Sequence, residues 1–462
     1  MYKHLSSITL AILIASLSSL GAQDFEAMFQ ERLKSVVVVE FFVETEEDRW
    51  SVDVNGIVVD DDGLIQLQDN ALPAWIPVEQ LKEFKVFQPG NLDEHDAEYL
   101  GQDRVFGWHY VRVLDEELKR SLISVTSYPI AELKTGSALW GIGLAAKGLD
   151  FTPYFMRSEV ATIQPMPNEI GFCTFDISSP GSVVFDLDGN FAGWGANPLN
   201  FDRVFTIEGR RFKGQIAKTD ETSTFFVATD LVGSFGNPPE SVEVIDWAWS
   251  GLLGLGPLDD EVSELMGLRG ESAITVSEIL ENGPADRAGI EDRDIIVSLN
   301  GESFKRYIPR HIVVSAFERQ LKQLNVGDQV SVGVLRGQER LELELILEEH
   351  PTLVRQAERT YFEKLGLTLR EFLLLDRVTL NVREGDQNSD GVIVSFVKTN
   401  SFAQTAGLAS GDLIQEIDGN LISDYSSAVE LVSEILADED RKDFVVLVRR
   451  GAETSVLRIN LK

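Results

Sequence analysis

The order of apolar and polar positions first marks an export signal at the start of the chain. Lys3 and His4 precede an apolar run over residues 5–20, and two small residues follow it. Charged, apolar and small segments in this order are typical of a secretory signal peptide. The run is shorter than the roughly 20 residues that a membrane-spanning helix needs. We therefore predict a signal peptide over residues 1–22 and an exported protein, periplasmic or secreted, with no membrane span after cleavage.

The next part of the chain has the pattern of closely spaced strands. Short apolar runs at residues 36–43, 55–59 and 138–144 are separated by clusters of Gly, Pro, Asn and Asp. Such runs with turn residues between them favour an all-β sandwich or a pair of barrels over a parallel α/β sheet. We expect a mostly β domain here, ending near residue 247.

A repeat fills the remaining part. Residues 281–301 and 399–419 follow one template with identical spacing, in which Ala-Gly precedes an Asp-aliphatic-Ile strand and an Asn/Asp-Gly turn. A strand-like run precedes each copy, and an amphipathic stretch, begun by Pro309 in the first copy, follows it. Each copy ends in a hairpin pattern with Arg-Gly at its turn. The repeat predicts two α+β modules at 248–350 and 351–462.

Composition narrows the range of partners and cofactors. The chain has 41 Lys+Arg against 75 Asp+Glu, a net charge of −34, which disfavours nucleic acid and anionic lipid as ligands. Its single cysteine, Cys173, cannot form an internal disulfide or a CxxC site, and we interpret it as a small core residue. The run 60–63, Asp-Asp-Asp-Gly, lacks the later glutamate of a calcium loop. We expect no metal and no other cofactor.

The two modules resemble the PDZ domain in the circularly permuted form of bacterial envelope proteases. The resemblance implies that an extended peptide adds to an exposed sheet edge, while amides of a glycine-containing loop hold its terminal carboxylate. Alternatively, the leucines of that loop only begin a buried strand, and the modules are spacers. The peptide-binding residues implied by the resemblance are Leu253, Gly254 and Leu255 in the first copy and Leu365, Gly366 and Leu367 in the second.

One loop differs between the two copies. The first has Arg293-Asp294 where the second keeps Gly411-Asp412, the pair typical of PDZ domains. The difference concerns the local loop and leaves the predicted fold of the module unchanged.

Two PDZ modules behind an exported β domain resemble the HtrA/Deg family of trypsin-like serine proteases. Residues 55–65, 101–103 and 177–193 are similar, in order and spacing, to segments that surround the catalytic His, Asp and Ser of that family. The resemblance implies a trypsin-like double β-barrel over residues 23–247. It also implies a homo-oligomer, a trimer in this family.

The three catalytic positions do not carry the family's residues. Asn70 stands where the histidine belongs, and Gly107 stands where the aspartate belongs. The serine loop is shortened, so that Gly181-Ser182 runs directly into Val183. An amide cannot take a proton from a serine hydroxyl, and the missing glycines would have supplied oxyanion-hole amides. We expect a catalytically inactive relative, a pseudoprotease.

Two histidines leave room for another interpretation. His95 and His109 precede Ser182, so a relocated set with Asp96, Asp103 or Asp115 as its acid is conceivable. His95 otherwise belongs to an acidic surface loop and His109 to a strand.

The function implied by the resemblance is recognition of C-termini or extended segments of unfolded envelope proteins. The protein would act in quality control, as a chaperone-like factor or as an adaptor for an active protease partner. Two alternatives remain at this point. One is an active serine endopeptidase with rearranged catalytic residues, and the other is a scaffold whose PDZ modules bind no peptide.

Overall fold

The structure is a computed structural model, and it is described here for most of the chain outside the predicted signal peptide. Residues 1–22 and Pro309 lie outside the described part, so the signal peptide stays a prediction. Within that part, no helix is long and apolar enough to cross a membrane. The described residues are 25–72, 76–165, 168–196, 203–207, 210–214, 222–240, 242, 247–268, 271–307, 310–380, 382 and 390–462.

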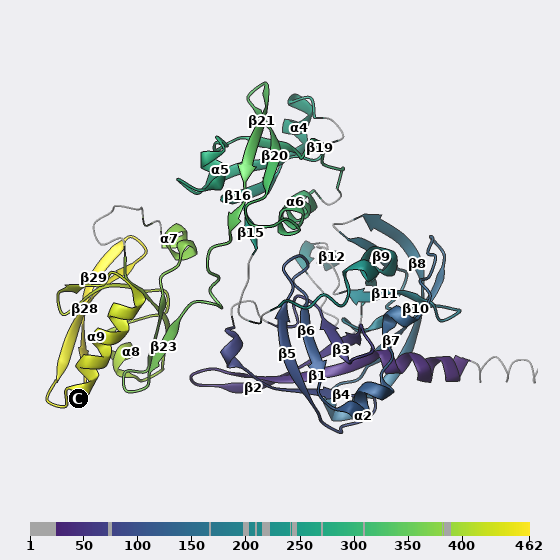
Figure 1. Cartoon of the computed structure of the whole chain (residues 1–462), viewed down its shortest axis with the longest axis horizontal. Coiled ribbons are helices and arrows are strands. Elements are labelled where there is room, and N and C mark those ends of the chain that lie inside the picture. The colour runs from purple at the N-terminus through teal and green to yellow at the C-terminus, as the bar shows by residue number, and fades with distance from the viewer. Residues whose placement is uncertain are drawn as a thin grey trace, which may run out of the picture. The chain divides into compact units, whose positions relative to one another are not determined.

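Contacts divide the chain into two compact units (Figure 1). The first comprises residues 1–41, 51–72 and 83–350, and holds both barrels and the first module. The second comprises residues 42–50, 73–82 and 351–462. The second module therefore groups with the tip of the first hairpin of the chain.

The first barrel closes from six strands in the order β1-β2-β3-β6-β5-β4. Closure pairs the strand edges that an open sheet would expose. Its strands are β1 (Val36–Glu44), β2 (Arg49–Val58), β3 (Leu64–Leu67), β4 (Leu81–Phe87), β5 (His95–Gln102) and β6 (His109–Val113). The short helices in this part of the sequence are residues 25–32, η1 (Leu33–Ser35), η2 (Val78–Gln80), α2 (Glu116–Ser121) and η3 (Val125–Ser127).

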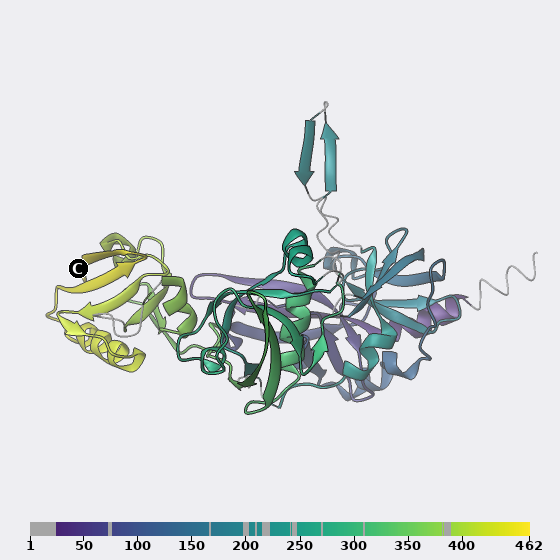
Figure 2. The same ribbon diagram turned by 90° about the horizontal axis from the view of Figure 1, so that it is seen from above.

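The second barrel also has six strands, in the order β10-β11-β14-β9-β8-β7. A separate hairpin of β12 (Arg203–Ile207) and β13 (Arg210–Gly214) is visible in Figure 2. The barrel strands are β7 (Ala138–Leu144), β8 (Pro153–Pro165), β9 (Glu169–Cys173), β10 (Val183–Asp186), β11 (Phe191–Ala196) and β14 (Thr224–Val227). Its helices are η4 (Lys147–Leu149), α3 (Ala228–Leu231) and η5 (Val232–Ser234).

One apolar cluster joins the two barrels. It includes Val36 and Ile57 from the first barrel and Trp140, Phe185 and Trp194 from the second, all fully buried. Aromatic side chains remove large apolar areas from water, so this cluster fixes the barrels against each other. The cleft described below lies along this junction. The structure confirms the predicted double barrel.

Both predicted modules are α+β sheets with flanking helices. Their sheets run in the orders β16-β17-β18-β20-β21 and β23-β24-β25-β26-β28-β29. The first module contains β15 (Ala248–Trp249), β16 (Leu252–Pro257), α4 (Asp260–Leu265), β17 (Ile274–Ile279), α5 (Pro284–Arg287), β18 (Ile295–Leu299), β19 (Glu302–Ser303), α6 (Ile312–Lys322), β20 (Gln329–Arg336), β21 (Glu339–Ile346) and β22 (Glu348–Glu349). The second contains β23 (Arg359–Phe362), β24 (Leu367–Glu371), α7 (Leu374–Leu380), β25 (Val392–Val397), α8 (Phe402–Ala406), β26 (Leu413–Ile417), β27 (Asn420–Leu421), α9 (Tyr425–Ala437), β28 (Asp443–Arg450) and β29 (Glu453–Asn460).

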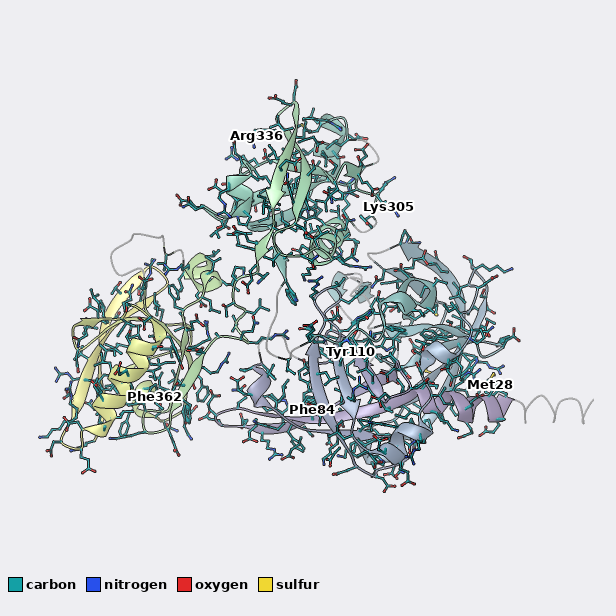
Figure 3. All side chains as sticks on the ribbon, viewed as in Figure 1. Met28, Phe84, Tyr110, Lys305, Arg336 and Phe362 are labelled. Carbon is teal, nitrogen blue, oxygen red and sulfur yellow. The ribbon has the colours of Figure 1, made fainter. Side chains whose placement is uncertain are left out.

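An equivalent ion pair, between an arginine and a buried aspartate, stabilises both copies. In the first, the Arg336 guanidinium (Figure 3) donates to both carboxylate oxygens of buried Asp294, at 2.9 and 2.8 Å. In the second, Arg450 donates to both oxygens of buried Asp412, at 2.6 and 2.7 Å. A bidentate pair of this kind fixes the geometry as well as the charge. The aspartate of each loop therefore has the same structural role.

The residue before that aspartate has a left-handed backbone in both copies. Arg293 has φ of 74° and Gly411 has φ of 90°. Their N–H groups make equivalent hydrogen bonds, to the carbonyls of Val276 and Val394. The loop thus keeps its shape although the glycine is absent from the first copy. Arginine is disfavoured in this conformation because its Cβ crowds the backbone, whereas glycine has no Cβ.

We therefore expect Arg293→Gly to raise the free energy of unfolding of the first module by about 0.5–1 kcal/mol. The reciprocal change Gly411→Arg is the control, and it should lower the stability of the second module by a similar amount. Thermal and denaturant unfolding of both variants would measure this. Stabilisation by both changes, or by neither, would contradict the shared left-handed loop.

Candidate functional site

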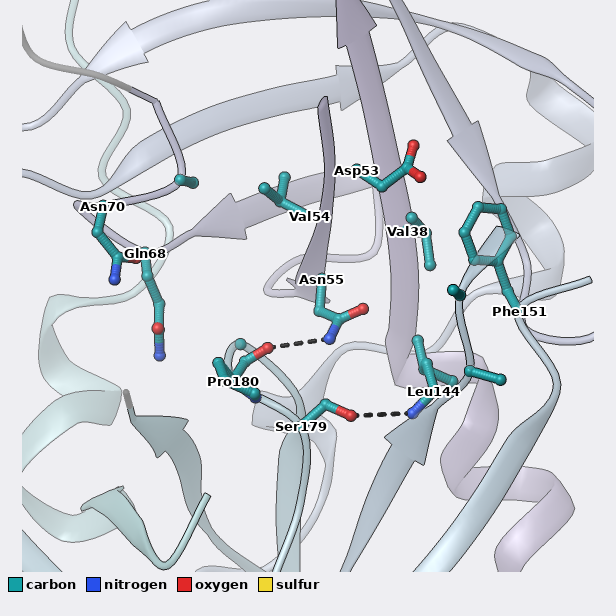
Figure 4. Close-up of a pocket in the computed structure, with 14 residues that line it drawn as sticks. Val38, Asp53, Val54, Asn55, Gln68, Asn70, Leu144, Phe151, Ser179 and Pro180 are labelled. Carbon is teal, nitrogen blue, oxygen red and sulfur yellow. Dashed lines mark hydrogen bonds between the residues drawn. The ribbon is translucent and has the colours of Figure 1, made fainter. Parts of the chain in front are cut away.

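A cavity of about 380 Å³ lies between the two barrels (Figure 4). The first barrel contributes Asn55 from β2 and the residues that follow β3, including Gln68 and Asn70. The second contributes Leu144, at the end of β7, and the loop 179–181. The position where the family resemblance places a histidine thus opens onto this cleft.

The turn at Asn70 and the loop at Gly107 are neighbours. A Cβ on Gly107 would lie 3.6 Å from the Cβ of Asp69 and 3.1 Å from Nε2 of Gln102. The fold therefore brings together the two positions that would hold a histidine and its orienting aspartate. Neither residue has a side chain that titrates near neutral pH, so the pair supplies no base.

Ser182 is buried away from the cleft. It is fully buried, and its Oγ is without a hydrogen-bond partner among the described residues. Its carbonyl accepts from the N–H of Gly195 at 2.7 Å, which continues the pairing of β10 with β11. The residue is held at the end of a strand pair, and it does not line the cavity.

Ser179, Pro180 and Gly181 line the cleft where a nucleophile loop would be expected. The Ser179 hydroxyl accepts from the Leu144 N–H at 3.0 Å, and the Pro180 carbonyl accepts from Asn55 Nδ2 at 2.9 Å (Figure 4). Pro180 has no N–H, and the N–H of Gly181 donates to the Gly195 carbonyl at 2.9 Å. The loop therefore presents neither an activated hydroxyl nor a pair of free amides for an oxyanion.

Neither histidine reaches the serine. His95 Nδ1 lies 2.8 Å from Asp115 Oδ2, and this hydrogen bond lowers the pKa of the Asp115 carboxyl. His109 is buried, with Nδ1 2.8 Å from the Tyr99 hydroxyl and Nε2 3.2 Å from the Asp69 carbonyl. Both nitrogens of His109 thus have protein partners. Each histidine has a structural environment of its own.

The remaining candidate groups are also structural. The Asp103 carboxylate accepts from the N–H groups of Val105, Phe106 and Trp108, at 2.9, 2.7 and 2.9 Å, and so closes its loop. Burial raises the pKa of the Cys173 thiol to about 12, which leaves it protonated and unreactive at neutral pH. No group of three or more His, Cys, Asp or Glu side chains that could hold a metal occurs within the described part of the chain.

In the first module, the loop glycine differs from the one that the sequence suggests. Leu253, Gly254 and Leu255 lie within strand β16. Gly251 precedes the strand with φ of 77°, and its carbonyl accepts from the Leu280 N–H at 2.9 Å.

The second module shows which glycine is equivalent. Gly366 has φ of 64°, and its carbonyl accepts from the Lys398 N–H at 2.8 Å. Lys398 corresponds to Leu280 in the repeat, so Gly366 matches Gly251. The neighbouring Leu365 and Leu367 are buried in the module core. Gly254 itself lies inside β16, and the register with β17 shifts on both of its sides.

Comparisons with known proteins agree with this architecture. Residues 253–347 and 375–435 match family models described as PDZ domain. A probable periplasmic serine endoprotease DegP-like from Hahella chejuensis is 24% identical over 343 residues, covering 72% of this chain and 66% of the relative. That alignment is longer than the two modules together, so it extends into the barrels. The chain is similar to HtrA/DegP-like serine proteases and has two PDZ domains.

Other DegP-like relatives match over shorter stretches. The DegP-like protein of Marinomonas sp. is 23% identical over 312 residues, 66% of this chain and 60% of the relative. The periplasmic serine endoprotease DegP of Escherichia coli K12 is 26% identical over 209 residues, 45% and 38% of the two chains. The chain therefore spans less than two thirds of the length of these curated relatives.

Solved structures of HtrA-type protease AlgW, with a decapeptide and with a tripeptide, are also similar. They are 13% and 14% identical, with TM-scores of 0.47 and 0.48. Each match covers 71% of this chain, and 98% and 97% of the respective AlgW chains.

Ser179, which lines the cleft, and the buried Ser182 should respond oppositely to truncation. Ser182→Ala removes a buried hydroxyl without a described partner, and we expect it to leave the free energy of unfolding unchanged or raise it by up to about 1 kcal/mol. Ser179→Ala leaves the Leu144 N–H without its acceptor and should lower the free energy of unfolding by about 1–2 kcal/mol. Equilibrium unfolding in denaturant measures both. A large loss from Ser182→Ala would show that its hydroxyl has a partner.

Proposed function

We propose that this HtrA/DegP-like protein is exported, binds peptide C-termini or extended segments of unfolded envelope proteins through PDZ recognition, and does not cleave them. In this role it would act in protein quality control or as an adaptor for an active protease, without a cofactor. Homo-oligomerisation follows from the family resemblance and remains a prediction.

The observation that carries the proposal is the chemistry of the cleft. Asn70 lines the cavity and Gly107 lies beside its neighbour Asp69, but neither Asn70 nor Gly107 supplies a base, and the loop over the cavity carries Pro180 in place of a free backbone donor. A serine protease needs a nucleophile in contact with a base and amides aimed at the developing oxyanion. The cleft lies where such a site would be expected. Its described lining residues supply neither a hydroxyl in contact with a base nor a pair of free amides.

The active-endopeptidase alternative requires a relocated base. His95 pairs with Asp115, and His109 contacts Tyr99 and Asp69, so either would have to leave these partners to reach a cleft hydroxyl. Ser182 would also have to leave a fully buried position. These requirements favour a binding protein over an enzyme.

The binding function is best supported in the first module. Within the described part of the chain, strand β16 is the terminal strand of its sheet, next to β17. Gly251 precedes it with the left-handed backbone that a close approach of a ligand's carboxylate to loop amides demands. The unpaired edge of β16 beside the Gly251 loop favours peptide binding over the scaffold alternative, in which the modules bind no peptide.

The absence of catalysis can be tested on the full chain with a serine-directed fluorophosphonate probe and an unfolded casein substrate. We expect neither covalent labelling nor cleavage, since no described hydroxyl meets a base in the cleft. An active DegP protein treated in parallel is the positive control. Labelling that disappears in Ser182→Ala or Ser179→Ala would reverse the proposal.

Peptide binding can be tested with a library of fluorescent decapeptides that have free C-terminal carboxylates. A Cβ on Gly251 would lie 2.8 Å from Cδ of Pro284, so Gly251→Val should distort the loop and weaken binding to the first module at least about tenfold. Gly337→Asn is the matched control, because this glycine has φ of 64°, open space around it, and a place in a hairpin turn. Equal effects of both variants, or no enrichment of any peptide, would favour the scaffold alternative.

A further inference from the structure

The second module closes the sheet edge that the first leaves open. Strand β16 is terminal in its sheet, and among the described residues only β17 pairs with it. The equivalent strand β24 has β25 on one edge and β23 on the other. β23 runs antiparallel to β24, with Thr360 opposite Leu369 and Phe362 opposite Leu367. A peptide that binds by strand addition would need this same edge.

The glycine loop of the second module already holds a carbonyl oxygen. The N–H groups of Leu365 and Gly366 both donate to the Phe362 carbonyl, at 3.0 and 2.9 Å. These amides belong to the loop that would hold a peptide's terminal carboxylate. The last residue of β23 therefore occupies the place of the last residue of a ligand.

The side chains of β23 complete this arrangement. Phe362 (Figure 3) is 7% exposed and belongs to the same apolar cluster as Leu367 and Val432 of α9. The Thr360 hydroxyl lies 2.6 Å from the hydroxyl of Tyr425, the first residue of α9. The segment thus presents an aromatic residue to the core and, two positions earlier, a hydroxyl to the helix.

The chain before β23 is anchored as well. The Arg359 guanidinium donates to the Val354 carbonyl at 2.6 Å and lies 3.6 Å from the Glu79 carboxylate. In the first module the entering segment takes another path. There β15 pairs with β22, with Ala248 opposite Glu349, and so turns away from β16.

We propose that Arg359–Phe362 is a built-in ligand of the second module. The module is closed to other peptides until β23 is displaced, and the peptides able to displace it are C-termini with phenylalanine last and threonine two residues before. External recognition therefore falls to the first module in the resting protein. This inference rests on the proposed function only for the statement that external peptides bind to the first module.

The test uses the full chain with Gly251→Val, which should weaken binding to the first module at least about tenfold. The probe is a fluorescein-labelled hexapeptide, Ala-Ala-Arg-Thr-Tyr-Phe, with a free carboxylate, and its affinity is read by fluorescence anisotropy. Thr360→Ala removes one hydrogen bond from the built-in segment and none from the probe. We expect it to tighten probe binding about fivefold, because a larger fraction of the protein has an open groove.

Two controls separate groove opening from general loosening. A probe with alanine in place of threonine should bind about fivefold more weakly than the parent, to both proteins. In Tyr425→Phe the two probes should bind equally, since the hydroxyl that distinguishes them is gone. Phe362→Ala should open the groove further. If Phe362→Ala fails to fold, the comparison with Thr360→Ala still tests the proposal.

The proposal would be overturned if Thr360→Ala left the affinity for the probe unchanged. It would also be overturned if the protein with β23 intact bound the probe as tightly as the opened variants. Equal binding of the two probes while Tyr425 is present would overturn it as well. Loss of peptide binding by the first module would defeat the proposed function, but it would not alter these comparisons. The two failures are therefore distinguishable.

Discussion

The pairing of strand edges is the constraint on which this structure depends. A strand with an unpaired edge exposes N–H and C=O groups that another strand can use. The two barrels remove the problem by closing, and their shared apolar cluster around Trp140 and Trp194 fixes the junction that forms the cleft. The modules differ because β16 ends its sheet, whereas β24 is covered by β23. In the proposed function, that difference determines where a peptide can add.

The cleft shows how a fold can keep the place of a site without its chemistry. Closure of the barrels and burial of the aromatic core position the cleft, and these depend on apolar residues far more than on Asn70 or Gly107. Pro180 and the buried hydroxyl of Ser182 fit a loop that is held by backbone pairing to β11. The proposed loss of the catalytic groups is therefore compatible with an intact domain that carries the PDZ modules.

Much of the fold could be predicted from the sequence. The repeat at 281–301 and 399–419 predicted both modules because its spacing fixes the same buried aspartate and left-handed turn in each. The alternating runs around the Arg-Gly turns predicted the closing hairpins, now seen as β20–β21 and β28–β29. Short-range periodicity determines such elements, so the pattern was sufficient.

The site was predicted less completely, for physical reasons. Gly251, and not Gly254, precedes the edge strand because pairing with β17 already begins at Leu252, and local sequence does not encode that start. The sequence also does not reveal that Arg359–Phe362 pairs with β24. In the first module the corresponding segment, β15, pairs with β22 instead. The position of Pro180 in the cleft depends on where the shortened loop re-enters β10.

One measurement tests the central claim, recognition without cleavage, most directly. The full chain is incubated with an unfolded polypeptide that carries a photoreactive residue near its C-terminus, and mass spectrometry reads the substrate's length and the cross-linked position together. The account predicts full-length substrate cross-linked to β16 or α6 of the first module. Substrate fragments, or cross-links confined to the cleft between the barrels, would contradict it.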